Sequence, residues 1–161
     1  TTSSSSAAGQ TASYNLGAIS FQGINGQAYS DLFKKNKMTV VNIMATWCSP
    51  CVKELPELQQ LNTAIKDKNI GLVAIVVDTF EHGKINKQAV EDATTLQNQA
   101  ARTFPMLIPD STGLDGFLNT VQVVPTTAFV DQNGKLIGVV TGSRNYQAWM
   151  NVVSEMESKI G

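Results

Sequence analysis

Ligands for a bound metal or haem are scarce in this sequence. It contains two cysteines and a single histidine, His82, whereas a structural zinc site needs four ligands. His82 lies in a different segment from the cysteines, and we expect it to be an ordinary loop residue. A c-type haem attachment needs a histidine directly after the second cysteine, but Val52 stands at that position. The sequence therefore predicts no metal site and no haem.

The chain also lacks a charge bias and long apolar runs. Twelve Lys and Arg residues against 13 Asp and Glu give a net charge of −1, with no basic stripe or acidic block, so nucleic acid is not an expected partner. The longest apolar stretch, from Ile70 to Val77, is far shorter than the ~20 residues that span a bilayer. At 161 residues the chain is long enough to bury its own core. We expect one monomeric domain over residues 14–161.

Residues 1–13 lack apolar periodicity and consist of small or polar residues before the first tyrosine. Such a segment cannot bury enough surface to offset its ordering entropy, which predicts a flexible tether. Spacers rich in Ser and Thr are typical between a membrane anchor and a folded envelope domain. We therefore expect an extracytoplasmic location in a bacterial cell envelope, with lipoprotein attachment as one form. A trimmed end without function is the alternative.

The two cysteines are present in one motif, Trp47-Cys48-Ser49-Pro50-Cys51, where an apolar run ends and a helical pattern begins. A helix N-terminus stabilises a thiolate, the reactive form of cysteine. We expect Cys48 to be the nucleophile, and Cys51, one turn later, to resolve the mixed disulfide. A purely structural disulfide that closes so small a loop would stabilise little compared with one closing ~15 residues. The motif thus predicts a redox-active pair.

The strongest secondary-structure patterns surround this motif. Two runs rich in β-branched residues, Met38–Ala45 and Ile70–Val77, predict strands covered on both faces, as in a parallel sheet. Between them, apolar residues recur every three or four positions and predict a helix over 49–66. Pro56 lies inside this helix, where it should kink the axis.

The rest of the chain predicts further strands and helices around these elements. Two apolar runs, 126–130 and 136–140, flank an Asn-Gly turn and predict a hairpin of antiparallel edge strands. Together the elements predict an α/β fold, a mixed sheet with helices on both faces. The weaker patterns are a strand over 16–21, a turn over 23–27, a short helix over 30–35 capped by Ser30, a helix over 84–101 leading to a strand over 104–108, and an amphipathic helix from Trp149 to Ile160.

Three landmarks resemble a known family. They are the stretch from Asn42 to Cys51, the triplet Glu54-Leu55-Pro56, and the segment Val124-Pro125-Thr126-Thr127. From about Ile19 onward the chain is similar to thioredoxin-fold proteins of the branch that contains the extracytoplasmic TlpA and ResA thiol–disulfide oxidoreductases. The resemblance implies a thioredoxin-like fold with an N-terminal strand extension. Residues 80–108 resemble the helix-plus-strand insertion of this branch.

The resemblance also implies roles for particular residues. Thioredoxin has a buried aspartate six residues before the nucleophile, but Asn42 stands here and cannot take a proton. In the branch a glutamate three residues after the second cysteine takes that role, which corresponds to Glu54; a solvated charge favoured by the helix dipole is the alternative.

The landmark at Pro125 implies a docking surface. In the family this proline is cis and faces the cysteines, so that the backbone of Val124 pairs with an extended substrate. Trp47 and Pro50, beside the cysteines, are expected to line the same surface.

The function implied is an extracytoplasmic oxidoreductase that reduces disulfides in envelope proteins, such as apocytochrome c or an oxidised methionine sulfoxide reductase. A membrane thiol donor would supply electrons, and no metal, flavin or nucleotide cofactor is implied. One alternative is an oxidase with the opposite redox poise. A second alternative, a thiol peroxidase, is disfavoured, because its motif has threonine and proline at the positions where Ala45 and Val41 stand. The last alternative is a docking module with a vestigial disulfide.

Overall fold

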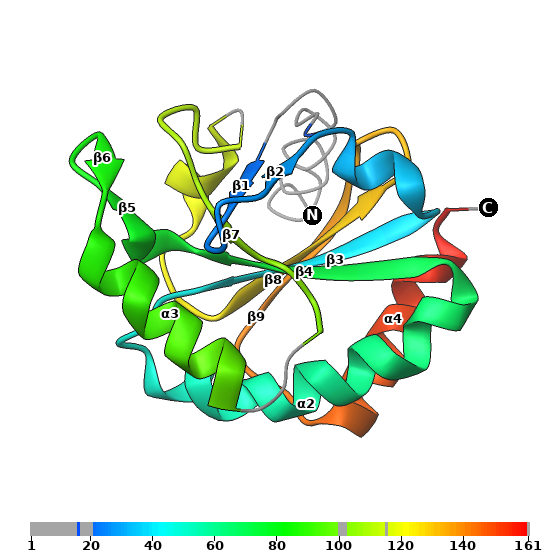
Figure 1. Cartoon of the computed structure of the whole chain (residues 1–161). Coiled ribbons are helices and arrows are strands. Elements are labelled where there is room, and N and C mark those ends of the chain that lie inside the picture. The colour runs from blue at the N-terminus through cyan, green and yellow to red at the C-terminus, as the bar shows by residue number, and fades with distance from the viewer. Residues whose placement is uncertain (1–15, 17–20, 100–102, 115, 161) are drawn as a thin grey trace.

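Figure 1 shows the protein as a computed structural model, which describes residue 16 and residues 21–99, 103–114 and 116–160. The predicted tether, residues 1–13, lies outside the described part of the chain. So do residues 17–20 of the expected first strand and residues 100–101 of the expected helix before residue 104.

A seven-stranded mixed sheet forms the centre of the molecule (Figure 1). Strand β4 (Ile70–Val76) pairs in parallel with β3 (Met38–Met44) and with β7 (Met106–Ile108), while β8 (Thr126–Asp131) pairs antiparallel with β3. A separate hairpin joins β5 (Phe80–Glu81) and β6 (Lys84–Ile85). In sheet order the strands are β2 (Ala28–Tyr29), β1 (Phe21–Gly23), β7 (Met106–Ile108), β4 (Ile70–Val76), β3 (Met38–Met44), β8 (Thr126–Asp131) and β9 (Leu136–Thr141).

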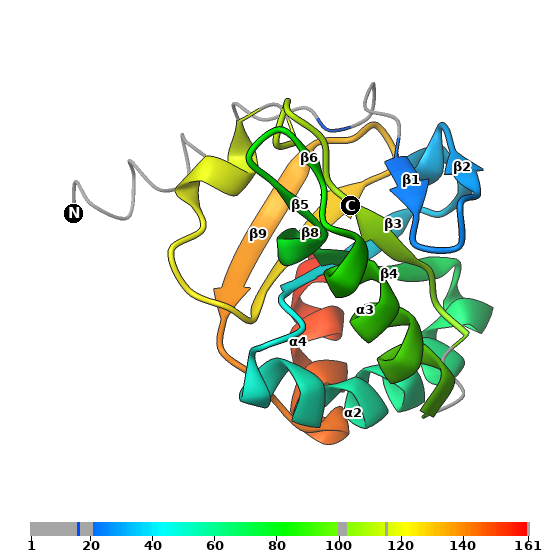
Figure 2. The ribbon, with the colours of Figure 1, turned by 60° about the vertical axis from the view of Figure 1, so that its left-hand side comes forward.

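The three α-helices cover one face of this sheet (Figures 1 and 2). They are α2 (Ser49–Ile65), α3 (Lys87–Gln99) and α4 (Tyr146–Ser158). Alternate residues of β3 point to opposite faces, so Met38, Val40 and Met44 pack in the core under the helices. Val41 and Ile43 pack in a second core on the other face.

The second face is covered by short 3-10 helices and loops. Phe33 of η1 (Leu32–Lys35) and Phe117 of η4 (Phe117–Thr120) are buried against it, together with Leu16. The predicted α/β class and mixed sheet are therefore confirmed. Helices lie on both faces, but the α-helices lie on one and 3-10 helices on the other. Two further 3-10 helices, η2 (Lys66–Lys68) and η3 (Val77–Thr79), flank β4.

Three local predictions were wrong. The helix expected from residue 84 begins at Lys87, because His82 and Gly83 have positive φ angles and turn the chain into the β5–β6 hairpin. Ser30 does not cap the short helix near it, since Asp31 occupies the N-cap position, with φ 52°. The predicted hairpin forms, but β8 lies between β3 and β9, so β9 alone of the two is an edge strand. The Asn-Gly turn specifies which strands pair, not their place in the sheet.

Candidate active site

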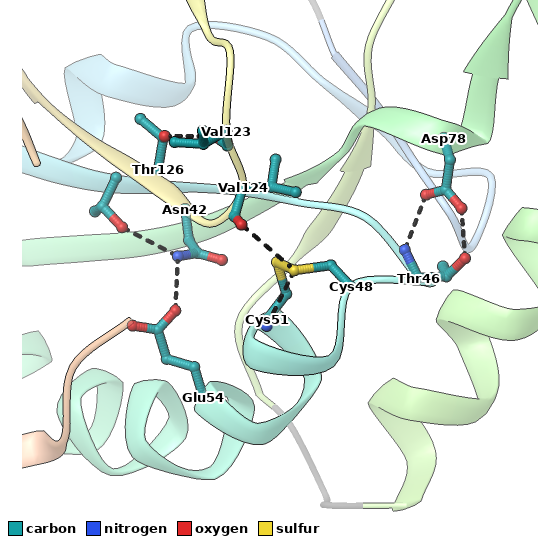
Figure 3. The surroundings of a disulfide bond; sticks show 10 residues. Asn42, Thr46, Cys48, Cys51, Glu54, Asp78, Val123, Val124 and Thr126 are labelled. Atoms are coloured by element: carbon teal, nitrogen blue, oxygen red, sulfur yellow. Dashed lines mark hydrogen bonds between the residues drawn. A yellow bond between two sulfur atoms is a disulfide. The ribbon is translucent and has the colours of Figure 1, made fainter. Parts of the chain in front are cut away.

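Cys48 and Cys51 form a disulfide where β3 leads into α2 (Figure 3). Cys48 occupies the N-cap position in an extended conformation, and its Sγ accepts a hydrogen bond from the backbone nitrogen of Cys51 at 3.3 Å. Pro50 fits the first turn because the nitrogen there has no partner within the helix. The exposed fraction is 4% for Cys48 and 0% for Cys51. Cys48 is therefore the outer of the two sulfur-bearing residues.

The segment that precedes β8 meets the disulfide through its backbone. The carbonyl oxygen of Val124 lies 3.6 Å from Cys48 Sγ (Figure 3), a position from which it can accept a hydrogen bond once Cys48 is a thiol. The Val124–Pro125 peptide bond is cis, and Pro125 is buried. Next to it, Thr126 Oγ1 donates to the carbonyl of Val123 at 2.7 Å.

Two of the predicted docking residues, Trp47 and Pro50, lie on the protein surface and flank Cys48 in the chain. Trp47, directly before Cys48, is 71% exposed, and Pro50 is exposed as well. Val123, beside Val124, is 55% exposed. An exposed tryptophan next to a reactive sulfur leaves a large apolar surface free for contact with another molecule.

The carboxylate of Glu54 lies under the sheet, only 2% exposed. Its Oε1 accepts from Asn42 Nδ2 at 3.4 Å, and its Oε2 accepts from Arg144 N at 2.9 Å and from Trp149 Nε1 at 2.8 Å. Burial raises the pKa of Glu54, while these three donors oppose the rise. In the described part of the chain, its hydrogen bonds go to these residues and none goes to a sulfur atom.

Sequence reasoning missed two of the three partners of this carboxylate. Trp149 was visible only as part of an amphipathic stripe, and it is fully buried. Arg144 carried no signal; its guanidinium lies 5.4 Å from the ring centroid of Trp149, and its Nη1 donates to the carbonyl oxygens of Thr141 and Gly142. A third missed residue is Asp78, whose carboxylate accepts hydrogen bonds from Thr46 just before the motif. Residues so far apart in the chain leave no local pattern.

A cavity of about 360 Å³ lies beside the site and shares Val124 with it. His82 and Phe80 line it, together with Val77 and Asp110. His82 is exposed in the turn between β5 and β6, so it remains a loop residue as predicted. Within the described ranges, no three His, Cys, Asp or Glu side chains gather as a metal site would require. No helix among these residues is long and apolar enough to cross a membrane.

The fold and the disulfide define the class of this protein, a thioredoxin-like thiol–disulfide oxidoreductase. A solved thioredoxin-family thiol:disulfide interchange protein from Chlorobium tepidum shares the fold, with a TM-score of 0.72 and 20% identity over 92% of this chain and 97% of that one. The chain belongs to the AhpC/TSA family, whose profile matches residues 18–139.

Two curated relatives support this assignment. The thioredoxin-like protein YneN of Bacillus subtilis is 30% identical over 142 residues, which are 88% of this chain and 74% of YneN. The thiol-disulfide oxidoreductase ResA of Bacillus cereus is 28% identical over 110 residues, 68% of this chain and 58% of that protein. The chain thus spans less than two thirds of the length of this ResA relative.

Proposed function

We propose that this protein works outside the cytoplasm and reduces disulfides in partner proteins, with Cys48 as the attacking residue. The observation that carries the proposal is the placement of Cys48 Sγ at the N-terminus of α2, 3.6 Å from the Val124 carbonyl and outside the fully buried Cys51. A sulfur at this helix end is stabilised as thiolate by the backbone N–H groups and the helix dipole. A substrate that lies along Val124 would bring its own disulfide to the same sulfur.

The reaction then takes two exchange steps. The Cys48 thiolate attacks one substrate sulfur, so that a mixed disulfide forms and the substrate disulfide breaks, releasing a substrate thiolate. The Cys51 thiolate next attacks Cys48 Sγ, which forms the enzyme disulfide and releases the second substrate sulfur. The two enzyme thiols give up two protons, which end on the two substrate thiols, and the substrate gains two electrons. Glu54 would carry the proton that leaves Cys51.

The location and partners are part of this proposal. They are supported by the resemblance to the extracytoplasmic TlpA and ResA branch and by the composition of residues 1–13, which suits a tether. Apocytochrome c or an oxidised reductase of the envelope would be the substrate, and a thiol donor in the membrane would reduce the enzyme disulfide again. The two sulfurs carry the electron pair themselves, so the chemistry needs no further cofactor.

The equilibrium reduction potential against glutathione and dithiothreitol tests the direction of the reaction. A reductase should lie near the ~−270 mV of thioredoxin, whereas a value near the ~−120 mV of DsbA would favour an oxidase instead. The same samples should reduce insulin with dithiothreitol as electron source, and Cys48→Ala should not accelerate that reduction. Absence of activity in the wild-type protein would contradict the proposal and favour a docking module with a vestigial disulfide.

A further inference from the structure

The buried side-chain amide of Asn42 makes two hydrogen bonds through its nitrogen and, within the described residues, none through its oxygen. Its Nδ2 donates to Glu54 Oε1 at 3.4 Å and to Thr127 Oγ1 at 3.1 Å. Its Oδ1 is buried and accepts no hydrogen bond from any residue that the structure describes. A buried carbonyl oxygen without a donor costs free energy, and native proteins rarely keep one without a reason.

The free oxygen faces the reactive cysteines. Asn42 lies on β3 with its side chain on the helix-covered face, and Figure 3 shows its Oδ1 pointing toward the disulfide while Nδ2 points toward Glu54. Neither Cys51 nor Cys48 carries a proton in the disulfide, so neither can donate to this oxygen. Reduction creates a thiol, and a thiol is a hydrogen-bond donor.

We propose that Asn42 is a positioning residue that links Cys51 to Glu54 and stabilises both arrangements of their shared proton by rotating its side-chain amide. This inference rests on the proposed function. With the proton on Cys51, the thiol donates to Oδ1 and Nδ2 donates to the Glu54 carboxylate. With the proton on Glu54, the amide is turned by half a rotation, so that Nδ2 donates to the Cys51 thiolate and Oδ1 accepts from the Glu54 carboxyl group.

Both arrangements pair every polar atom of the amide. The hydroxyl of Thr127 suits either one, because a hydroxyl accepts from Nδ2 in the first and donates to Oδ1 in the second. The step moves one proton from Cys51 Sγ to the Glu54 carboxylate and transfers no electrons. Asn42 does not carry the proton itself. An ionised aspartate could not take this linking role, since a carboxylate has no donor for the thiolate.

Other charged groups face this cluster. Lys53 and Glu57, on the same helix as Glu54, and Arg144, before α4, line a cavity of about 320 Å³ that Glu54 also lines. Arg144 lowers the pKa of Glu54 through its charge as well as through its backbone N–H. Thr127 on β8, which bonds the amide, and Trp149 on α4, which bonds Glu54, are uncharged. Substitution of Asn42 leaves all of these charged groups in place. A change in the pH dependence of the Cys51 step in an Asn42 variant therefore reports on the loss of the amide.

The reaction of the reduced protein with stoichiometric DTNB separates the two cysteines. Cys48 attacks first and releases one thionitrobenzoate, and Cys51 then resolves the mixed disulfide and releases the second. We expect Asn42→Ala to slow the second phase about tenfold, equivalent to about 1.4 kcal/mol, and to shift its pH midpoint upward, with the first phase within twofold of wild type. A second phase with the wild-type rate and midpoint would overturn the inference.

Two further measurements keep the test decisive if Asn42→Ala does not fold. Thr127→Val preserves a β-branched strand residue and removes one partner of the amide, so it should slow the second phase and shift its midpoint in the same direction, while Thr127→Ser restores both. In the reduced wild-type protein, the side-chain amide signals of Asn42 should titrate in NMR spectra with the midpoint of the second phase. Signals that do not change with pH would overturn the inference. Failure of the first phase in wild type would instead contradict the proposed function.

Discussion

Asp78 holds Thr46 through both oxygens of its carboxylate. Oδ1 accepts from the backbone nitrogen of Thr46 at 3.0 Å, and Oδ2 accepts from the hydroxyl of the same residue (Figure 3). Asp78 is 8% exposed and lies in η3, which follows β4 directly, whereas Thr46 lies in the link between β3 and α2. The carboxylate thereby fastens the loop that carries Trp47 and Cys48 to the end of the neighbouring parallel strand.

Asp78→Ala should lower the free energy of unfolding by about 1–3 kcal/mol, because it leaves the two donors of Thr46 without their partner. The loop before Cys48 would also lose its anchor, so we expect slower formation of a mixed disulfide with a protein substrate. Urea denaturation of the oxidised protein measures the first effect, and stopped-flow mixing with a disulfide substrate measures the second.

Asp78→Asn is the matched control for this pair. Its side-chain oxygen still accepts from the backbone nitrogen of Thr46, and its amide can donate to the hydroxyl, which accepts as well as donates. We expect this variant to retain most of the stability that Asp78→Ala loses. Equal unfolding free energies for Asp78→Ala and the wild type would show that the two hydrogen bonds do not stabilise the loop.

The cysteines should differ in their ability to trap a substrate. Cys51→Ser retains the outer sulfur of Cys48 and lacks the resolving thiol, so mixed disulfides should accumulate. Cys48→Ser leaves only the buried sulfur and should trap almost no partner. Non-reducing electrophoresis after mixing with an oxidised protein measures both. Equal trapping by the two variants would reverse or remove the proposed division of roles.

Glu54 should make the free energy of unfolding of the oxidised protein decrease as the pH rises. Burial raises the pKa of Glu54 from its ordinary value of 4.5, so the folded protein binds this proton more tightly than the unfolded chain. The stability from the bound proton is complete below the ordinary pKa and is lost as the pH rises through the folded-state pKa. Urea denaturation at a series of pH values from about 4 upward measures it.

Glu54→Gln is the control, because it keeps the shape of the side chain and does not titrate. The difference in unfolding free energy between wild type and variant should therefore change with pH in the direction given above. Disulfide exchange should slow by about 10²-fold, the low end of general acid–base assistance. Parallel stability curves, together with wild-type exchange rates from about pH 6 to 9, would make Glu54 a structural residue without a role in proton transfer.

Trp47→Ala should affect protein substrates more than small ones. The side chain is 71% exposed, so its removal should change the free energy of unfolding by no more than about 0.5 kcal/mol. If Trp47 contacts the substrate protein, KM for a protein disulfide should rise several-fold, while the rate with DTNB stays close to that of wild type. A similar loss with both substrates would show that Trp47 acts on Cys48 itself and not on docking.

The sequence alone determined the reactive motif and the strands that carry it. Runs of buried β-branched residues end at the cysteines, and strand β3 and helix α2 follow the predicted ranges within one residue at the motif. These features depend on neighbours in the chain, because helix periodicity, strand composition and the turn at Asn133-Gly134 are local properties. The family resemblance added Glu54 and Pro125. The structure places Glu54 under the sheet, and Pro125 directly after Val124, whose carbonyl oxygen lies 3.6 Å from Cys48 Sγ.

Only the tertiary structure decided the surroundings of those residues. Asp78 meets Thr46 across 32 positions of the chain, and Trp149 meets Glu54 across 95. The free oxygen of Asn42 and the interior place of β8 likewise emerge only when the sheet is assembled. A local pattern records which face of an element is apolar, but not which element covers that face. The polar contacts that tune the site form where several elements meet, so their partners cannot be read from spacing along the chain.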